Sequence, residues 1–452
     1  MAHKSDHLCV LVHGLWGNPS HLDFLKSSLR ERYDEDRLYI LAAKGNSGNF
    51  TYDGIELGGE RLAHEIEDTL GILAGEGNHI TKLSIVGYSL GGLVARYALG
   101  LLYARGWFDK LEPVNFTTFV TPHVGVRMPL KGFQDHVFNA IGARTLSTSG
   151  RQLFLMDSFR DTGKPLLSIL ADSDSIFMQA LAKFRNRSVY GNIVNDRSTH
   201  FFTTVVSTTN PFQDLGNKNV KYVKGYEPVV IDPDAYFLPP KEKKPLPFAS
   251  RLWQQITGWL TKLSIWLLVI VLVPIAISLF LLNAVVQTYR SRQRIRLHED
   301  GKAGVLLSNY RVPIIVKDVQ SAVEGAFENV NGMQDPDYLP NISNDTSKTG
   351  APLRTSAVTV GDSLGSNDNT DQTSTLMSDD VCGDEKSPTL ALTPAQFSII
   401  NSLNSVGFRK YPVWIHNHRH SHAAIIVRVP KKGFEEGGTV VKHWLDNGFD
   451  IE

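Results

Sequence analysis

Four histidines stand at alternate positions in the stretch "WIHNHRHSHAAIIVR", residues 414–428: His416, His418, His420 and His422. In a strand, alternate side chains share one face. Such a face could bind zinc or copper, or one imidazole could act in acid–base chemistry. The spacing lacks the separated ligand pairs and the HExxH pattern of zinc sites, and Arg419 would repel a cation. We therefore expect acid–base chemistry and no metal.

A serine nucleophile is predicted more than 300 residues upstream. The sequence Gly87-Tyr88-Ser89-Leu90-Gly91 lies between a strand-like "KLSIVG" and a helix-like "LGGLVARYALGLLYARG". Gly-x-Ser-x-Gly in that context is typical of a nucleophile elbow, in which a tight turn exposes the serine hydroxyl. The N-terminus of the following helix would then point at the site. We expect the Leu90 N–H to stabilise an oxyanion there.

A second oxyanion donor is expected from the loop after the first strand. The stretch "LCVLVHGLWGN" places His13-Gly14-Leu15-Trp16-Gly17 at the end of that strand, ahead of the elbow. The N–H of Leu15 is the natural candidate, because this loop supplies the second donor in nucleophile-elbow enzymes. The alternative is an ordinary glycine-containing turn.

The order of a catalytic triad on such a sheet is serine, then acid, then histidine. Asp196 ends the strand-like "SVYGNIVND" and is the predicted acid, although a turn aspartate is the simpler interpretation of Asn-Asp. Asp157 in "LFLMDS" is the rival, with a less clear strand before it.

The predicted catalytic histidine is His422, which opens the apolar "HAAIIV", with His420 as the alternative. The rest of the quartet would be polar loop residues. Other downstream histidines fit less well because of their positions, next to Asp196, in an arginine-rich segment or within a helix: His200, His298 and His443.

Composition sets wider limits on the fold and on the class of protein. The chain has 452 residues, formal net charge zero and two cysteines. These values argue against a nucleic-acid-binding protein and a disulfide framework, and favour a reducing compartment. Short β-rich runs alternate with amphipathic helical stretches over residues 7–240. This alternation predicts an α/β protein with a mostly parallel sheet and helices on both faces.

An uncharged run of 27 residues, 263–289, follows an amphipathic stretch and precedes four arginines. As a helix it would be ~40 Å long, enough to cross a bilayer. A crossing would separate Ser89 from His422. Because Pro274 can break the helix and both flanks are basic, we expect a hairpin that enters and leaves one lipid face.

These features divide the chain into five parts. Residues 1–240 form the hydrolase core with the nucleophile and the acid, and 241–300 form the membrane-anchoring segment. Residues 301–330 connect it to 331–392, which composition predicts to be a disordered insertion. Residues 393–452 complete the core and carry the catalytic histidine.

Several motifs together resemble the fungal putative serine esterase/lipase family of α/β-hydrolases, most closely its yeast lipid-droplet phospholipase branch. They are "VLVHGLWGNPSHL", "YDGIELGGERLAHEI", "GYSLGGLVARYALG", "FVTPHVGV" and "SVYGNIVNDRS", and the resemblance returns at "YPVWIHNHRHSHAAIIVR". It implies an ester hydrolase acting on glycerolipids or phospholipids. The elbow carries Tyr88 where the family commonly has histidine, beside the nucleophile.

The combined expectation is a serine lipid ester hydrolase that needs no cofactor and releases fatty acids from phospholipids. It would face the cytosol on a lipid droplet or membrane, with the endoplasmic reticulum as a second location, and no nucleic acid or protein partner is indicated. The alternatives are a neutral lipase for triacylglycerol or sterol esters, a protein thioesterase, and a non-catalytic droplet tether.

Overall fold

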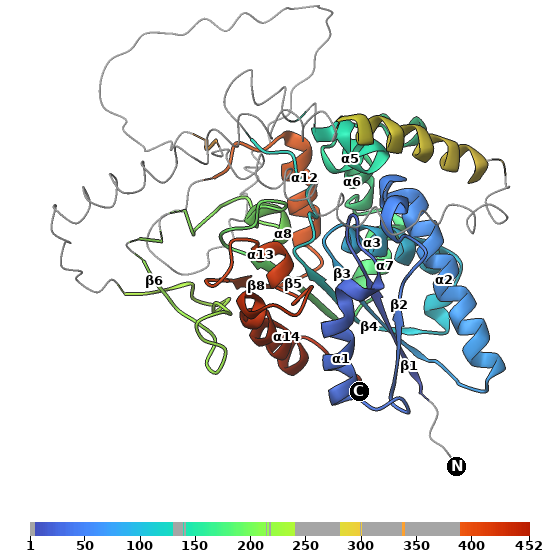
Figure 1. Cartoon of the computed structure of the whole chain (residues 1–452), viewed down its shortest axis with the longest axis horizontal. Helices are drawn as coiled ribbons and strands as arrows, with labels where there is room; N and C mark the ends of the chain where they lie inside the picture. The colour runs from blue at the N-terminus through green and yellow to red at the C-terminus, as the bar shows by residue number, and fades with distance from the viewer. Residues whose placement is uncertain are drawn as a thin grey trace, which may run out of the picture.

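The computed structural model shows a central parallel sheet wrapped by helices (Figure 1). It describes residues 5–129, 139, 142–213, 215–216, 218–239, 281–298, 300, 337–339 and 389–452. Six strands pair in the order β2-β1-β3-β4-β5-β8, and every pairing is parallel. Their bounds are β1 His7–Val12, β2 Leu38–Ala42, β3 Lys82–Tyr88, β4 Glu112–Phe119, β5 Asn186–Asn192 and β8 Arg409–Val413. The chain therefore has an α/β-hydrolase-like fold.

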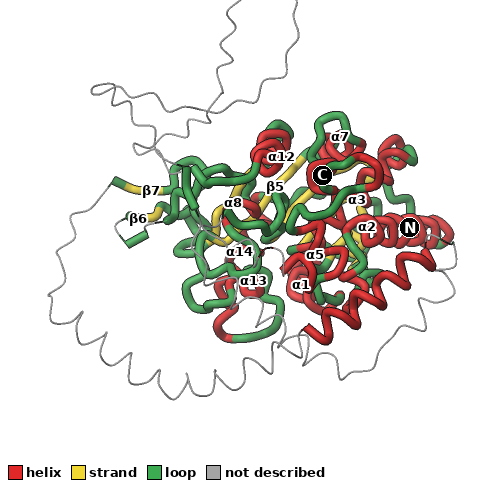
Figure 2. Tube along the Cα trace, turned by 90° about the horizontal axis from the view of Figure 1, so that it is seen from above, coloured by secondary structure: helices red, strands yellow, loops and turns green. Residues whose placement is uncertain are grey.

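Helices cover both faces of the sheet because strand side chains alternate between the faces. In β1, Leu8, Val10 and Val12 belong to one apolar cluster, and Cys9 and Leu11 belong to another. The first cluster includes side chains of α2 Ile55–Gly75, α3 Leu90–Ala104, α5 Ser147–Leu153, α6 Leu166–Leu170, α7 Ile176–Ala182, α8 Phe201–Thr204 and α12 Pro394–Asn404. The second includes α1 Asp23–Arg32, α13 Ser421–Ala424 and α14 Glu435–Asn447. Figure 2 shows the strands enclosed between these helices.

The strand-like and helix-like stretches on either side of Ser89 are β3 and α3, and the strand-like stretch before Asp196 contains β5. Helix α2 is amphipathic, because Leu62, Ile66, Leu70 and Leu73 recur at helical spacing and are all buried. A short antiparallel pair, β6 Asn219–Val220 and β7 Phe237–Leu238, lies outside the main sheet.

The C-terminal part of the chain joins the sheet formed by the N-terminal part. Strand β8 pairs with β5 from Ser188↔Arg409 to Asn192↔Val413. Within the range 331–392, the described residues 337–339 and 389–392 contact the core. Tyr338 and Leu390 form a bridge, and Leu390 is buried. Residues 337–339 and 389–392, which fall within the predicted insertion, are thus in contact with the core.

The apolar run is described only from residue 281, where a helix continues through 298. Residues 263–280, with Pro274, lie outside the described residues, so the hairpin stays a prediction. No helix within the described part of the chain is long and apolar enough to cross a membrane.

Candidate active site

Ser89 lies on a strained turn between β3 and α3. Its φ of 53° and ψ of −127° fall in a region that side-chain-bearing residues rarely adopt. Neighbouring glycines make the turn possible: a Cβ on Gly91 would stand 2.2 Å from the Val12 carbonyl oxygen, and one on Gly87 would stand 2.4 Å from the Cα of Gly92. The turn therefore has the tight strand–helix geometry that the Gly-x-Ser-x-Gly pattern predicts.

The loop after β1 packs directly against Ser89. A Cβ on Gly14 would stand 2.7 Å from the Ser89 Cβ, so only glycine permits this approach. Leu15 from this loop and Leu90 from the first turn of α3 both line the cavity that holds Ser89. The Ser89 side chain makes no capping hydrogen bond to α3. The two predicted oxyanion residues are thus brought to the same place as the serine.

Asp196 and His422 form a buried hydrogen-bonded pair, which becomes an ion pair when the imidazole is protonated, although they are 226 residues apart in sequence. The His422 Nδ1 lies 3.1 Å from Asp196 Oδ1 and 3.0 Å from Oδ2. Asp196 follows β5 in a loop, and His422 lies in α13 after β8. A neutral imidazole that donates from Nδ1 keeps Nε2 as its acceptor, the arrangement required of a general base.

Several groups hold the Asp196 carboxylate. Asn192 Nδ2 donates to Oδ2 over 3.0 Å, and the Thr199 N–H donates to Oδ1 over 2.8 Å. Burial alone would raise the pKa of Asp196, but the attraction to His422 and these hydrogen bonds together lower it below its ordinary value of 3.8. The carboxylate therefore stays charged at neutral pH and can stabilise an imidazolium.

Two residues that the sequence did not indicate complete this arrangement. The Thr199 hydroxyl lies 3.2 Å from His422 Nδ1, next to the carboxylate. Tyr88 packs its ring 5.3 Å from the His422 imidazole and donates its hydroxyl to the His422 carbonyl oxygen over 3.2 Å. The position that departs from the commonest family form thus contacts the candidate histidine. In the sequence, the only indication that Tyr88 belongs to the site was its position next to Ser89.

Ser89 and His422 line one cavity that is open to solvent. Most of its remaining wall is apolar: Leu15, Trp16, Tyr88, Leu90, Pro122, Val126, Leu146 and Leu153. Such a lining suits a hydrocarbon chain, because burying apolar surface is favourable and the few polar groups orient the reacting bond.

The four histidines do not share a strand face. Strand β8 ends at Val413, and the quartet occupies the following loop and the start of α13. His416 stacks on Trp414 and pairs with Glu436, while His418 Nδ1 accepts the His420 N–H. In the described part of the chain no cluster of histidine, cysteine, aspartate and glutamate could hold a metal ion.

The rival residues lie in other environments. Asp157 accepts the Leu166 N–H over 2.9 Å, and burial raises the pKa of its carboxyl. His298 pairs with Glu60. His443 is buried and hydrogen-bonded to the Tyr190 hydroxyl, and burial lowers its pKa to about 4.

Comparisons with known proteins agree with this chemistry. Residues 2–210 match a family model described as "Putative serine esterase". Putative lipase C4A8.10 of Schizosaccharomyces pombe is 28% identical over 46% of this chain and 27% of its own length. Putative lipases ROG1 and YDL109C of Saccharomyces cerevisiae are 30% and 31% identical, over 44% and 43% of this chain and 28% and 29% of their own. The matched region is thus less than a third of each relative.

Among solved structures, phospholipase PlaB from Legionella pneumophila aligns with a TM-score of 0.26 and 14% identity, over 47% of this chain and 43% of that one. A lipase-esterase related protein from Clostridium acetobutylicum aligns with a TM-score of 0.21 and 17% identity, over 40% and 60%. By sequence, the N-terminal part of this chain, residues 2–210, matches the putative serine esterase family.

Proposed function

We propose that this protein is a serine-dependent lipid ester hydrolase that releases fatty acids from phospholipids. One observation carries the proposal: Ser89, on its strained turn, shares a mainly apolar cavity with a histidine that is ion-paired to a buried aspartate. The match to putative serine esterases and lipases supports the ester chemistry.

In the proposed reaction, the Ser89 hydroxyl attacks the ester carbonyl carbon while His422 accepts its proton. The N–H groups of Leu15 and Leu90 stabilise the oxyanion, and Asp196 stabilises the imidazolium. The tetrahedral intermediate collapses, the ester C–O bond breaks, and the imidazolium protonates the departing lysolipid oxygen. Water, deprotonated by His422, then attacks the acyl-enzyme and releases the fatty acid, which regenerates Ser89.

We further propose that the enzyme works at the surface of a lipid droplet or membrane and faces the cytosol. The uncharged run at 263–289 and the basic residues on both of its sides support this location. A hairpin at Pro274 would keep Ser89 and His422 in one compartment. Equal access of protease to both ends of the chain on intact organelles is the expected result.

The test of the function is fatty-acid release by wild type and Ser89→Ala, measured side by side on phospholipid vesicles and on a triacylglycerol emulsion. We expect release from vesicles that disappears in the variant. Release mainly from the emulsion would change the assignment to a neutral lipase. If neither substrate is cleaved in a Ser89-dependent way, the proposal fails, and acyl-thioester substrates become the next assay.

A further inference from the structure

The helix at residues 281–298 has the reverse polarity of an ordinary surface helix. Its inner face, against the core, carries Gln287, Ser291 and Arg294, which are buried, with only Ala284 as a buried apolar residue. A surface helix normally turns its apolar stripe toward the core. This helix is therefore held to the core by polar contacts, and its large apolar side chains do not face the core.

Those apolar side chains lie on the outer face. Eleven large apolar side chains are exposed in the described part of the chain, and five of them fall within nine residues of this helix: Leu281, Leu282, Val285, Val286 and Tyr289. Val285 is 67% exposed and Leu282 63%. Clusters of this kind mark contact surfaces, because isolated exposed apolar residues are common and grouped ones are not.

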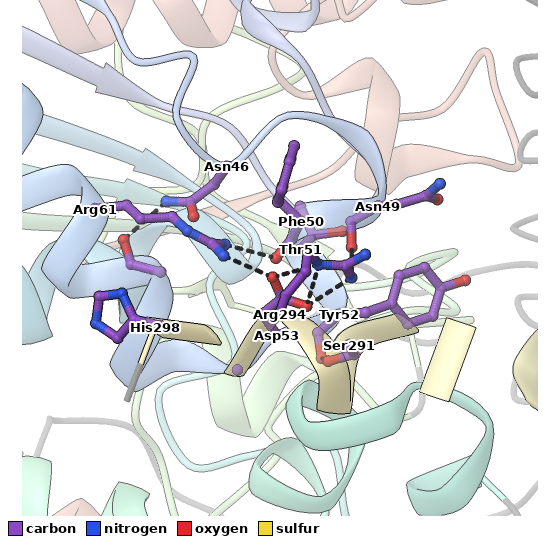
Figure 3. Close-up of polar contacts among 12 residues, drawn as sticks. Asn46, Asn49, Phe50, Thr51, Tyr52, Asp53, Arg61, Ser291, Arg294 and His298 are labelled. Carbon is purple, nitrogen blue, oxygen red and sulfur yellow. Dashed lines mark hydrogen bonds and ion pairs between the residues drawn. The ribbon is translucent and has the colours of Figure 1, made fainter. Parts of the chain in front are cut away.

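The inner face is fixed to residues 49–53 by a buried ion pair (Figure 3). Arg294 donates to Asp53 from Nε over 2.9 Å and from Nη2 over 2.6 Å, and Arg61 Nη2 donates to Asp53 Oδ2 over 2.8 Å. Arg294 also donates to the Asn49 carbonyl oxygen, and the Ser291 hydroxyl donates to that of Tyr52. Bidentate contact to a buried carboxylate gives this attachment a defined geometry.

The same segment, 49–53, contacts the candidate oxyanion loop. The Trp16 N–H donates to the Thr51 hydroxyl over 3.0 Å, and Trp16 Nε1 donates to the Tyr52 hydroxyl over 2.7 Å. Trp16 lines the cavity of Ser89 and has a φ of 55°. One chain of contacts therefore joins the helix at 281–298 to the wall of the candidate active site.

We propose that the outer face of this helix, defined by Leu281, Leu282, Val285, Val286 and Tyr289, docks on an anionic phospholipid surface and sets the cavity mouth against it. The inference rests on the proposed lipid hydrolase and names the surface to which that site is presented.

Three features of the chain favour lipid over another protein as the occupant. The apolar face continues an uncharged sequence, 263–280. The C-terminal half of the helix exposes Arg290, Arg292 and Arg296, which match anionic headgroups. The apolar half would then enter the acyl region while the arginines stay at headgroup depth, as in interfacial helices.

The test uses Ser89→Ala protein, so that vesicles stay intact, with Cys382→Ser to leave only the buried Cys9. An environment-sensitive fluorophore is attached at Val285→Cys or, as a matched control, at Ile72→Cys. Ile72 is 62% exposed on α2, about 18 Å along that helix from Glu60, which contacts His298. Phosphatidylcholine–phosphatidylserine vesicles carrying acyl-chain quenchers are then added.

We expect a blue shift and quenching at position 285 and neither effect at 72. Emission at 285 that is unchanged by vesicles would overturn the proposal, because the face would have stayed in water. Emission already blue-shifted before lipid is added and insensitive to the quenchers would overturn it too, in favour of another segment of the chain or a second copy. Equal quenching at both positions would indicate nonspecific coating.

An activity measurement separates docking from chemistry. Leu282→Ser combined with Val285→Ser should lower turnover on vesicles about tenfold or more, because less apolar surface leaves water on docking. Turnover of a soluble short-chain ester should not change, and Ile72→Ser should change neither. A wild type inactive on the soluble ester would count against the proposed hydrolase, whereas the quenching result does not depend on catalysis.

Discussion

Asp196 and Asp53 are both buried carboxylates paired with a side chain more than 220 residues away, yet their surroundings differ. Asp196 pairs with one imidazole and borders the cavity of Ser89 through Thr199. Asp53 pairs with two guanidinium groups, from α2 and from the helix at 281–298. A histidine can gain and lose a proton near neutral pH, whereas arginine remains charged. The first pair is suited to proton transfer and the second to fixed attachment.

The comparison shows why a buried ion pair alone does not identify a catalytic site. Removing the basic partner of either pair leaves a carboxylate with less compensation in a place with little water, which is costly in both cases. Of the two pairs, only the Asp196 pair has a member, His422, that lines the cavity of Ser89 on its strained turn. Substitutions at the two pairs should therefore separate loss of catalytic chemistry from loss of helix attachment.

The largest effect is expected from Asp196→Asn. The amide would no longer stabilise the imidazolium or select the tautomer that accepts the Ser89 proton, so kcat should fall by about 10⁴-fold. Asp157→Asn is the matched control, because Asp157 is the rival acid and bonds to a backbone N–H. Steady-state kinetics on a soluble ester measures both. An equal loss in the two variants would contradict the assignment.

Arg294→Ala should weaken the attachment of the helix at 281–298 to residues 49–53. It leaves Asp53 with Arg61 alone and opens a gap under the helix, and we expect the free energy of unfolding to fall by about 3 kcal/mol. The exposed Arg290→Ala on the same helix should change it by less than about 0.5 kcal/mol. Urea titration measures both. A stability of Arg294→Ala equal to wild type would show that the pair does not hold the helix.

Tyr52→Phe tests the contacts that connect the helix at 281–298 to Trp16 in the candidate oxyanion loop. It removes the hydroxyl that accepts the Trp16 Nε1 hydrogen bond and should cost about 1 kcal/mol of stability, with a few-fold lower kcat. Tyr39→Phe, an exposed tyrosine on β2, serves as the control. A lower stability with unchanged kcat would mean that the contact is structural and does not position the oxyanion loop.

The smallest expected effect is the pH dependence of the stability that the Asp196 pair contributes. Because the pKa of Asp196 is lower in the folded protein than its ordinary value of 3.8, its pairing stabilises the fold fully above that pH and loses this effect as pH falls through the folded value. The stability difference between wild type and Asp196→Asn should therefore narrow from pH 5 to pH 3. Urea titrations across that range measure it. A constant difference would contradict the lowered pKa.

The sequence alone determined much of the core. A short continuous apolar run marked β1, helical spacing marked α2, and the glycines around Ser89 marked a turn that few other residues could form. These signals are local, since strand and helix periods and glycine requirements are set by neighbouring residues. The choice of Asp196 and His422 used the order of residues along the chain and left Asp157 and His420 as alternatives.

Only the tertiary structure decided which distant side chains meet. The Asp196–His422 pair depends on β8 pairing beside β5, and the contacts of Tyr88 and Thr199 with His422 follow from that pairing. The apolar run predicted a lipid segment, but not that the helix continuing from its end would turn Arg294 inward to Asp53. Contacts across more than 200 residues leave no local period in the sequence, because they arise when the sheet brings its strand ends together.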